Sequence, residues 1–428
     1  MKQTTYDTAS TVQDRAVLVS LITQVMKRSD TNHDLSLQEL AKLAETAQVE
    51  VVSTVTQNRV SRDAKWFIGK GKVEELKAVI DELDANTAIF DQELSGAQVR
   101  NLEQVLNVKI IDRTQLILDI FAQRAKTREG IIQVELAQLS YILPRLSGHG
   151  KNLSRLGGGI GTRGPGESKL ETDRRHIRGR ISELKRQLEE VVRHRSLYRE
   201  RRRKTGIYQV ALVGYTNAGK STLLNQLTEA DVLIEDQLFA TLDPTSRTLA
   251  LPSGKEIVIT DTVGFIQNLP HDLVAAFRAT LEEVCEADLI LHVVDSSSEM
   301  RDDQMRVVDE ILQELGAAAK PQVLLYNKID ACTPSQREML PSGPQVLKIS
   351  AYNLADQERI RELIQQHVVG DTRTFCVPAD RGEIISLLYR TGDVLEQVVE
   401  DEDLWIQVRL NRADYEKQGY LLDPYMQL

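Results

Sequence analysis

Cysteine is scarce in this chain of 428 residues, which contains only Cys285, Cys332 and Cys376, without the spacing of metal ligands. We therefore expect neither a disulfide framework nor a structural zinc site, and a reducing compartment fits. No apolar run approaches the roughly 20 residues that a membrane-spanning helix needs. The polar start Met-Lys-Gln-Thr-Thr-Tyr-Asp lacks the pattern of a signal peptide. We expect a cytoplasmic protein without a membrane span, and peripheral association with a membrane stays open.

A net positive charge is also absent outside one segment. Residues 145–204 hold 18 Lys and Arg against 7 Asp and Glu, a local charge of +11, whereas the rest of the chain carries -21. A sharply basic segment in an acidic protein is suited to an anionic partner, although a solvated charged helix is the commoner reason for such a run. The length indicates three or four domains rather than one core.

The strongest motif is Gly-Tyr-Thr-Asn-Ala-Gly-Lys-Ser at 214–221, which fits the phosphate-loop pattern G-x-x-x-x-G-K-[ST]. An apolar run at 207–213 precedes it and a helical pattern at 222–227 follows it, which is the strand–loop–helix context that the motif requires. Backbone N–H groups of this loop can bind a polyphosphate. Lys220 would reach the β and γ phosphates, and Ser221 would hold Mg²⁺.

A second motif, Asp-Thr-Val-Gly at 261–264, follows the apolar run 256–260. Asp261 should therefore lie at the carboxyl edge of a parallel strand, where it would hold Mg²⁺ through water, with the Gly264 N–H at the γ phosphate. The loop 239–245 offers two threonines that can close over Mg²⁺ and the γ phosphate. We favour Thr241 and keep Thr245 as the second choice.

Base recognition is indicated by Asn-Lys-Ile-Asp at 327–330, between two predicted strands, and by Ser350 and Ala351. The Asp330 carboxylate can accept from guanine N1–H and the exocyclic amine, a donor pair that adenine lacks. Asn327 can tie this loop to the phosphate loop, Lys328 can pack its stem over the base, and the Ala351 N–H can read guanine O6.

Phe265 stands directly after Asp-x-x-Gly, where GTPases of the Ras type have a glutamine that orients the attacking water. Slow intrinsic hydrolysis is one expectation; the alternative is that Phe265 packs inward and another side chain serves. Asn217 resembles the asparagine with which several translation-associated and RNA-modification GTPases hold K⁺. It is a candidate K⁺ ligand, or it only stabilises the loop.

Before residue 112, short strand and helix patterns alternate, which predicts an α/β domain without a catalytic constellation. Gly-Lys-Gly-Lys at 69–72 is either a phosphate seat or, more commonly, a turn and helix cap. Residues 113–204 predict two long helices, because apolar residues repeat at spacings of four and three in 132–146 and in 177–191. Such stripes indicate an antiparallel hairpin, with Pro144 bending or ending the first arm and coiled-coil dimerisation as the competing explanation.

Between these helices lies a Gly-rich segment at 156–169, flanked by basic residues. A flexible basic tip on a stiff arm suits folded RNA, whereas a plain linker is the alternative. The candidate RNA-binding residues are Lys151, Arg155, Arg163, Lys169, Arg174 and Arg175.

Together, the motifs at 157–167, 239–245 and 261–265 resemble those of the HflX family of ribosome-associated GTPases. This resemblance implies binding to the large ribosomal subunit near its peptidyl transferase centre, ribosome-stimulated hydrolysis, and dissociation of stalled or idle ribosomes under stress. Tyr352 departs from the lysine that many GTPases have after Ser-Ala. The alternatives are an RNA-remodelling or RNA-modification GTPase, a signalling GTPase whose hairpin binds protein, and a second nucleotide site in the N-terminal domain.

We therefore predict a P-loop GTPase domain at 205–370, an N-terminal α/β domain at 1–112, a helical hairpin at 113–204 with its tip at 147–170, and a small α+β domain at 371–428. The free protein is expected to be a monomer that binds GTP or GDP with Mg²⁺. The predicted nucleotide-binding residues are Gly214, Tyr215, Thr216, Asn217, Ala218, Gly219, Lys220, Ser221, Thr222, Asp261, Gly264, Asn327, Lys328, Asp330, Ser350, Ala351 and Tyr352. Those assigned to hydrolysis are Asn217, Lys220, Thr241, Gly264 and Phe265, and those assigned to Mg²⁺ are Ser221, Thr241 and Asp261.

Overall fold

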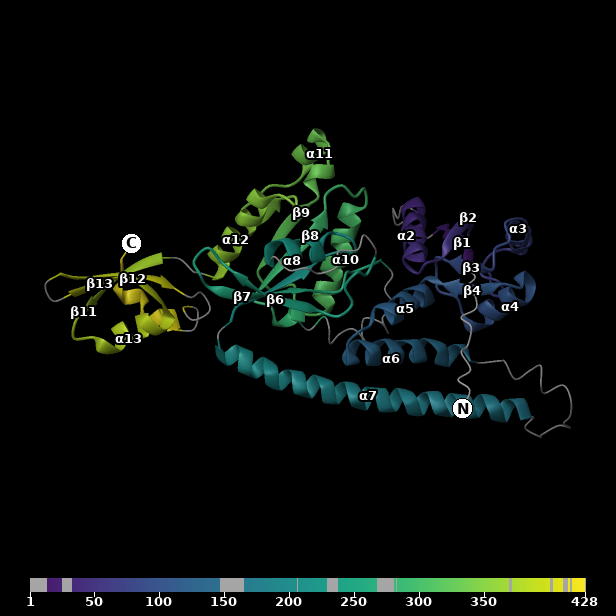
Figure 1. The fold of residues 1–428 in the computed structure, drawn as a ribbon, viewed down its shortest axis with the longest axis horizontal. Helices are drawn as coiled ribbons and strands as arrows, with labels where there is room; N and C mark the ends of the chain where they lie inside the picture. The colour runs from purple at the N-terminus through teal and green to yellow at the C-terminus, as the bar shows by residue number, and fades with distance from the viewer. Residues whose placement is uncertain are drawn as a thin grey trace, which may run out of the picture.

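A computed structural model of the chain contains three separate sheets, arranged along the long axis of the molecule with a long helix beneath two of them (Figure 1). The structure describes residues 14–24, 33–146, 165–205, 207–228, 238–267, 281, 283–368, 372–400, 403–410, 415 and 418–427; the side chains of 165–170, 194–205 and 393 are outside this description. None of the helices within these ranges is long and apolar enough to span a membrane.

The N-terminal sheet is fully parallel, with the strand order β2-β1-β3-β4. Its strands are β1 (Arg15–Thr23), β2 (Glu50–Arg59), β3 (Thr87–Phe90) and β4 (Lys109–Asp112). The helices between them are α2 (His33–Thr46), α3 (Lys70–Glu82) and α4 (Gly96–Leu106). This confirms the predicted strand–helix alternation. Gly69 is the N-cap of α3, which fits the turn-and-cap interpretation.

Residues 113–205 form three helices, so the prediction of two long helices was wrong in its first half. The helices are α5 (Arg113–Arg124), α6 (Arg128–Arg145) and α7 (Pro165–Thr205). The break comes at Thr127, whose side chain accepts a hydrogen bond from Gly130 N and so caps a new helix. Pro144 lies in the last turn of α6, which ends at Arg145, as expected for the end of the first arm.

One face of α6 packs against α7 and forms the predicted seam. Its buried centre is Leu184 of α7 against Ile132 and Leu136 of α6. An exposed Arg180–Glu135 ion pair, 2.7 Å long, joins the same helices. Another face of α6 contributes Val134 and Ala137 to the core of the N-terminal half. The seam is thus filled within one chain, as the hairpin prediction requires.

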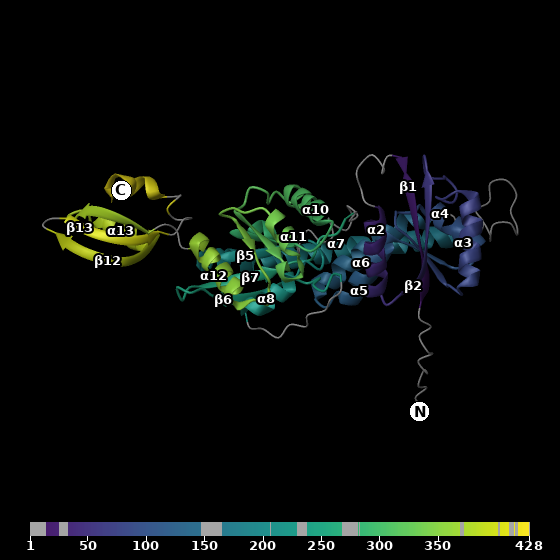
Figure 2. The same cartoon turned by 90° about the horizontal axis from the view of Figure 1, so that it is seen from above.

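The central sheet has the order β10-β9-β8-β5-β7-β6, parallel except for β6. Its strands are β5 (Gln209–Val213), β6 (Thr245–Ala250), β7 (Glu256–Asp261), β8 (Leu289–Asp295), β9 (Gln322–Asn327) and β10 (Val346–Lys348). The helices are α8 (Lys220–Thr228), α10 (Arg301–Glu314), α11 (Pro334–Met339) and α12 (Leu354–Val368). Figure 2 shows this sheet and its helices between the other two sheets. All predicted GTP motifs follow strands of this sheet at their carboxyl ends.

The C-terminal residues form an antiparallel sheet of order β12-β13-β11-β14 with its own core around Phe375, Leu388 and Ile406. Its elements are β11 (Thr372–Pro378), α13 (Gly382–Thr391), β12 (Gly392–Glu400), β13 (Asp403–Leu410) and β14 (Met426–Gln427). We keep the domain division at 112/113, 204/205 and 370/371 as a proposal, with one qualification. Helix α5 packs into the core of the N-terminal sheet through Ile117 and Phe121.

Candidate functional site

The phosphate loop turns between β5 and α8 at two glycines that no other residue can replace without a clash. Gly214 has φ +154°, and a Cβ there would lie 2.2 Å from the carbonyl oxygen of Val293. Gly219 has φ +95°, and its Cβ would lie 2.3 Å from Asn327 Nδ2. Both positions therefore need glycine for conformation and for space. The result is a loop whose backbone can approach a polyphosphate closely.

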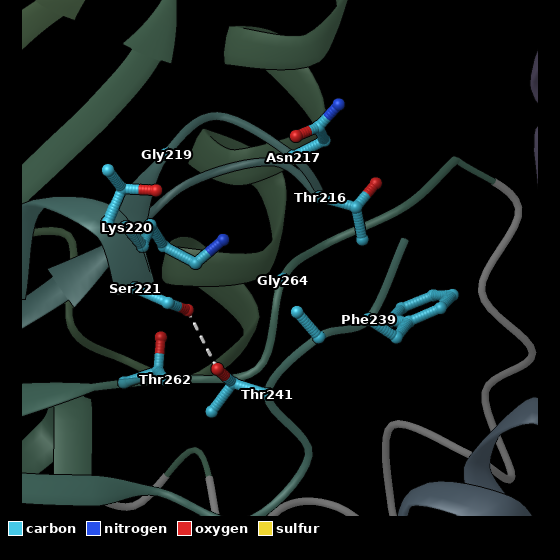
Figure 3. A pocket seen from close by; sticks show the side chains of 11 residues that line it. Thr216, Asn217, Gly219, Lys220, Ser221, Phe239, Thr241, Thr262 and Gly264 are labelled. Atoms are coloured by element: carbon cyan, nitrogen blue, oxygen red, sulfur yellow. Dashed lines mark hydrogen bonds between the residues drawn. The ribbon is translucent and has the colours of Figure 1, made fainter. Parts of the chain in front are cut away.

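Lys220 is buried at the first position of α8, and its ammonium extends into the cleft (Figure 3). Nζ donates to the carbonyl oxygens of Gly214 at 3.1 Å and Tyr215 at 2.9 Å. Burial lowers the pKa of Lys220 to about 8, although Asp261 opposes the shift. A polyphosphate in this cleft would favour the charged form again, so the residue is suited to binding an anion.

The three predicted Mg²⁺ ligands meet on one side of the cleft. The Ser221 hydroxyl donates to Asp261 Oδ2 at 2.6 Å, and the Thr241 hydroxyl donates to the same oxygen at 2.7 Å. The two hydroxyls are 2.8 Å apart and point toward each other (Figure 3). Thr245, the second choice, instead begins β6 and pairs with Asp261 across the sheet. The geometry therefore favours Thr241.

This cluster has the chemistry of a magnesium site. Asp261 is 1% exposed, burial raises the pKa of its carboxyl, and its Oδ1 has no hydrogen-bond partner among the described residues. A buried carboxylate oxygen without a partner is costly unless a ligand or a cation satisfies it. Mg²⁺ prefers oxygen ligands, usually one or two protein groups with waters and substrate phosphates. The residues present fit that ion.

The base-recognition segment lies at the carboxyl end of β9. Asn327 Nδ2 donates to the Ala218 carbonyl at 2.9 Å, which confirms that this residue ties the segment to the phosphate loop. Its Oδ1 accepts from Ala351 N at 3.0 Å, so reading guanine O6 with that N–H would require sharing or releasing this bond. Asp330 is exposed and Tyr352 is 66% exposed.

Two carboxylates that the sequence reading missed hold this region in place. Asp295, at the end of β8, forms a 2.8 Å ion pair with Lys328. Asp356, in the first turn of α12, accepts from Ser350 N at 2.9 Å. The signal for Asp295 was available, since it ends an apolar strand beside β5 and β9.

Phe265 packs inward, the orientation on which the second expectation depends, and slow intrinsic hydrolysis stays a prediction. Phe265 is 2% exposed and lies in a core cluster with Val213, Val284 and Ile290. Its backbone bridges to the phosphate loop, since Phe265 N donates to Gly214 O at 3.1 Å and Thr216 N donates to Phe265 O at 2.8 Å. The ring is therefore a structural anchor, and it does not orient water.

Gly264 lies so close to the phosphate loop that a Cβ would come within 2.9 Å of Thr216 Cα and 3.1 Å of Lys220 Nζ. Gly264 is therefore held against the phosphate loop, beside the Lys220 ammonium. Asn217 has φ +60° and is exposed at the outer side of the loop (Figure 3). Eleven residues, among them Phe239 and Thr262, line an open cleft of about 440 Å³.

Tyr215 connects the phosphate loop with the N-terminal half through a buried polar network. Its hydroxyl donates to Glu39 Oε1 of α2 at 2.5 Å and accepts from Gln267 N at 2.7 Å. Arg113, 2% exposed, donates to Glu39 Oε2 at 2.8 Å and to Asp91 at 3.1 Å. Burial raises the pKa of Glu39, and the Arg113 charge opposes that shift. No motif in the sequence indicates this contact.

The candidate RNA-binding residues are only partly within the structural description. Lys151, Arg155 and Arg163 lie outside the described residues, and the same holds for the side chain of Lys169. Arg174 and Arg175 lie on α7, where Arg174 is half-buried and Arg175 is exposed. Their assignment to RNA stays a prediction.

Neither Cys332 nor Cys376 is suited to nucleophilic chemistry. Burial raises the pKa of both thiols, whereas reactive cysteines need a lowered pKa. The described residues contain no group of three or more His, Cys, Asp and Glu side chains that could hold a metal ion. An RNA-modifying activity based on Cys332 or Cys376 therefore finds no support in the structure.

Three family models match the chain in succession. They are described as GTP-binding GTPase N-terminal over residues 34–122, GTP-binding GTPase Middle Region over 124–202 and 50S ribosome-binding GTPase over 209–328. The GTPase HflX of Caldanaerobacter subterraneus is 50% identical over 401 residues, 93% of this chain and 91% of that protein. The GTPase HflX of Escherichia coli is 42% identical over 387 residues, 89% of this chain and 91% of that protein.

Solved structures include the complex of SsGBP with GDP. It is 25% identical, covers 83% of this chain and 98% of that chain, and has a TM-score of 0.47.

Proposed function

Because this chain belongs to the HflX family of GTPases and is itself a GTP-binding GTPase, we propose that it binds the large ribosomal subunit and dissociates stalled or idle ribosomes. GTP binding drives engagement in this proposal, and hydrolysis drives release. The single observation that carries it is the basic arm. This arm is the basic segment 145–204, which carries +11 in a chain of -10. Helix α7 makes up most of the segment and leads into the GTPase domain.

The arm has the stiffness and charge that a ribosomal surface requires. α7 is one helix of 41 residues, supported on part of its length by α6. Arginine and lysine on such a helix meet RNA phosphates through salt-dependent contacts. The family model described as a 50S ribosome-binding GTPase supports a ribosomal partner rather than a free RNA.

A nucleotide-dependent switch is the proposed cause of engagement. The loops at 236–247 and 261–270 contain the site residues Thr241 and Gly264; of them, 238–247 and 261–267 are described. When bound, Mg²⁺ would neutralise phosphate charge beside Ser221, Thr241 and Asp261. Ordering of both loops by GTP would then fix the GTPase domain against the arm in a geometry that fits the subunit.

Sedimentation of ribosomes tests the order of these events. Intact ribosomes incubated with the protein and a non-hydrolysable GTP analogue should separate into subunits, and the protein should stay on the large subunit. With GDP they should remain intact. Intact ribosomes in the presence of the analogue would show that hydrolysis, and not binding, performs the separation.

A charge-reversed variant tests the arm itself. Arg174→Glu combined with Arg175→Glu should weaken large-subunit binding and flatten its dependence on salt, because phosphate contacts release counterions. Basal GTP hydrolysis should be unchanged, since both residues lie away from the cleft. Arg247→Glu, on the exposed face of β6, is the matched control. Equal loss in both variants would argue for non-specific charge attraction.

Potassium is the second part of the proposal. The exposed Asn217 lies at the rim of the cleft, where an amide oxygen can help hold a monovalent cation beside the phosphates. We expect faster hydrolysis in KCl than in NaCl at equal ionic strength, and loss of that difference in Asn217→Ala. Equal turnover of the original protein in both salts would remove K⁺ from the mechanism.

A further inference from the structure

The loop that carries Thr241 is built into the core of the N-terminal half. Leu238, Phe239 and Leu242 are buried in one cluster with residues of α5 and α6. The rings of Phe239 and Phe121 of α5 meet edge to face, with centroids 4.6 Å apart and planes at 76°. Aromatic pairs of this geometry add specific attraction to the area they bury. Phe239 therefore attaches the loop to α5. Thr241, two residues further along the chain, faces Ser221 and Asp261.

A polar contact at Asp243 attaches the same loop to the start of α6. The carboxylate accepts from Lys126 N at 3.0 Å and from Thr127 N at 2.9 Å, and the Thr127 hydroxyl donates to its other oxygen. That hydroxyl also accepts from Gly130 N at 3.0 Å, as the N-cap of α6. A carboxylate is well placed there, because the first N–H groups of a helix lack partners and carry partial positive charge.

The fit is close. A Cβ on Gly130 would lie 2.5 Å from Asp243 Oδ1, so this turn of α6 is adapted to the carboxylate. The contact with α6 and the contact of Thr241 with Ser221 and Asp261 occur in one conformation. Only Leu242 separates Thr241 from Asp243 along the chain. Fixing Asp243 therefore limits the positions that the Thr241 hydroxyl can reach.

We propose that Asp243 is a positioning residue for GTP hydrolysis, which acts by docking on Thr127 at the start of α6 and so holding Thr241 against Ser221 and Asp261. Asp243 does not touch the nucleotide cleft, and its effect passes through Thr241. The inference concerns hydrolysis by the protein alone and does not depend on the ribosomal partner. The corner between α5 and α6 thus keeps the Thr241 loop closed over the cleft.

Asp243→Asn and Thr127→Ala test the contact in the full-length protein. Asn keeps the size of the side chain but loses its charge, and Ala removes the hydroxyl donor. Both variants should lower kcat/KM for GTP by about 10- to 100-fold, the range that a misplaced reacting group can cost. They should also need several-fold more Mg²⁺ for half-maximal hydrolysis, while GDP affinity, which does not need a closed Thr241 loop, stays within about twofold.

Matched variants separate positioning from loss of a helix cap. Thr127→Ser keeps the hydroxyl and should retain hydrolysis. Ser95→Ala removes a comparable cap, that of α4, away from the cleft; it should lower thermal stability as Thr127→Ala does, without changing kcat/KM. The double variant Thr127→Ala with Asp243→Asn should lose less than the product of the two single losses, because the Thr127 hydroxyl acts through Asp243.

Three outcomes would overturn the proposal. The first is that Thr127→Ala hydrolyses GTP as fast as Ser95→Ala. The second is that GDP and GTP affinities fall equally, which would indicate general damage to the site. The third is that the losses in the double variant multiply, which would show that the two residues act independently.

Discussion

Phe265 shows what a sequence can and cannot say about one residue. Its place after Asp-x-x-Gly identified a missing glutamine, but two orientations of the ring were equally compatible with the motif. In the structure the ring is buried beside Val213 and Val284. These apolar neighbours come from other elements, so the motif alone could not indicate the orientation. Tyr215 is the opposite case. It was predicted only as part of the phosphate loop, and its hydroxyl reaches Glu39, 176 positions away in the chain.

Tyr215→Phe should loosen the contact between the two halves. The change leaves the Glu39 carboxylate and Gln267 N without their shared partner in a buried place, at a cost of about 1–3 kcal/mol. We expect a thermal midpoint lower by about 3–10 °C. Tyr326→Phe is the control, because among the described residues that hydroxyl has a single hydrogen-bond contact, with Met305 sulfur at 3.8 Å. An equal decrease in both variants would mean that the Glu39 contact adds no stability.

His292 should make part of the stability depend on pH. Burial and the nearby Lys220 charge lower the pKa of His292 to about 4, against about 6.5 in an unfolded chain. Because the folded value is depressed, stability is present above about pH 6.5 and is lost as the pH falls toward 4. Between pH 7 and pH 5 the original protein should lose about 2 kcal/mol more than His292→Gln. Thermal unfolding at both pH values measures this; parallel losses in the two proteins would contradict it.

At the scale of elements, the apolar spacing of the sequence predicted where helices and strands run, but it did not predict where a helix breaks. The strand–helix alternation before residue 112 and the seam of α6 with α7 followed from spacing alone. The break between α5 and α6 did not, because Ala125 to Thr127 contain neither glycine nor proline and the apolar stripe resumes at Ile132. The break is stabilised by Asp243 from another domain, which is tertiary information. The loop that carries Thr241 thus contacts the corner between α5 and α6.

Leu184→Ala should open the seam between α6 and α7. Leu184 is fully buried in a small cluster, and removal of such a side chain costs about 2–5 kcal/mol. Hydrogen exchange in residues 171–193 should become faster, while basal GTP hydrolysis is unchanged. Arg180→Ala is the control on the same helix, because its exposed ion pair with Glu135 contributes about 1 kcal/mol or less. If Arg180→Ala accelerated exchange more, charge rather than apolar burial would hold the arm.

At the scale of the whole molecule, the sequence indicated the domains and their order but not how they touch. Each motif is local, whereas Arg113, Glu39 and Tyr215 come from three separate segments and meet only after folding. The C-terminal sheet is different in this respect. Its core around Phe375 and Ile406 is its own, and no described residue of the nucleotide cleft comes from it.

A chain shortened to end at Val368 should therefore hydrolyse GTP at a rate within about twofold of the full-length protein, because a domain with its own core can be removed as a unit. Steady-state phosphate release, with folding checked by circular dichroism, measures the effect. A loss of tenfold or more would show that the C-terminal residues act on the site.

The unbroken length of α7 has a mechanical consequence. Its 41 residues span about 60 Å at the rise of an α-helix. If the GTPase domain turned by about 5° at the Thr205 end, the Pro165 end would move by about 5 Å, roughly the pitch of an α-helix. A rotation too small to rearrange the nucleotide cleft would thus move the Pro165 end of α7 by several ångströms.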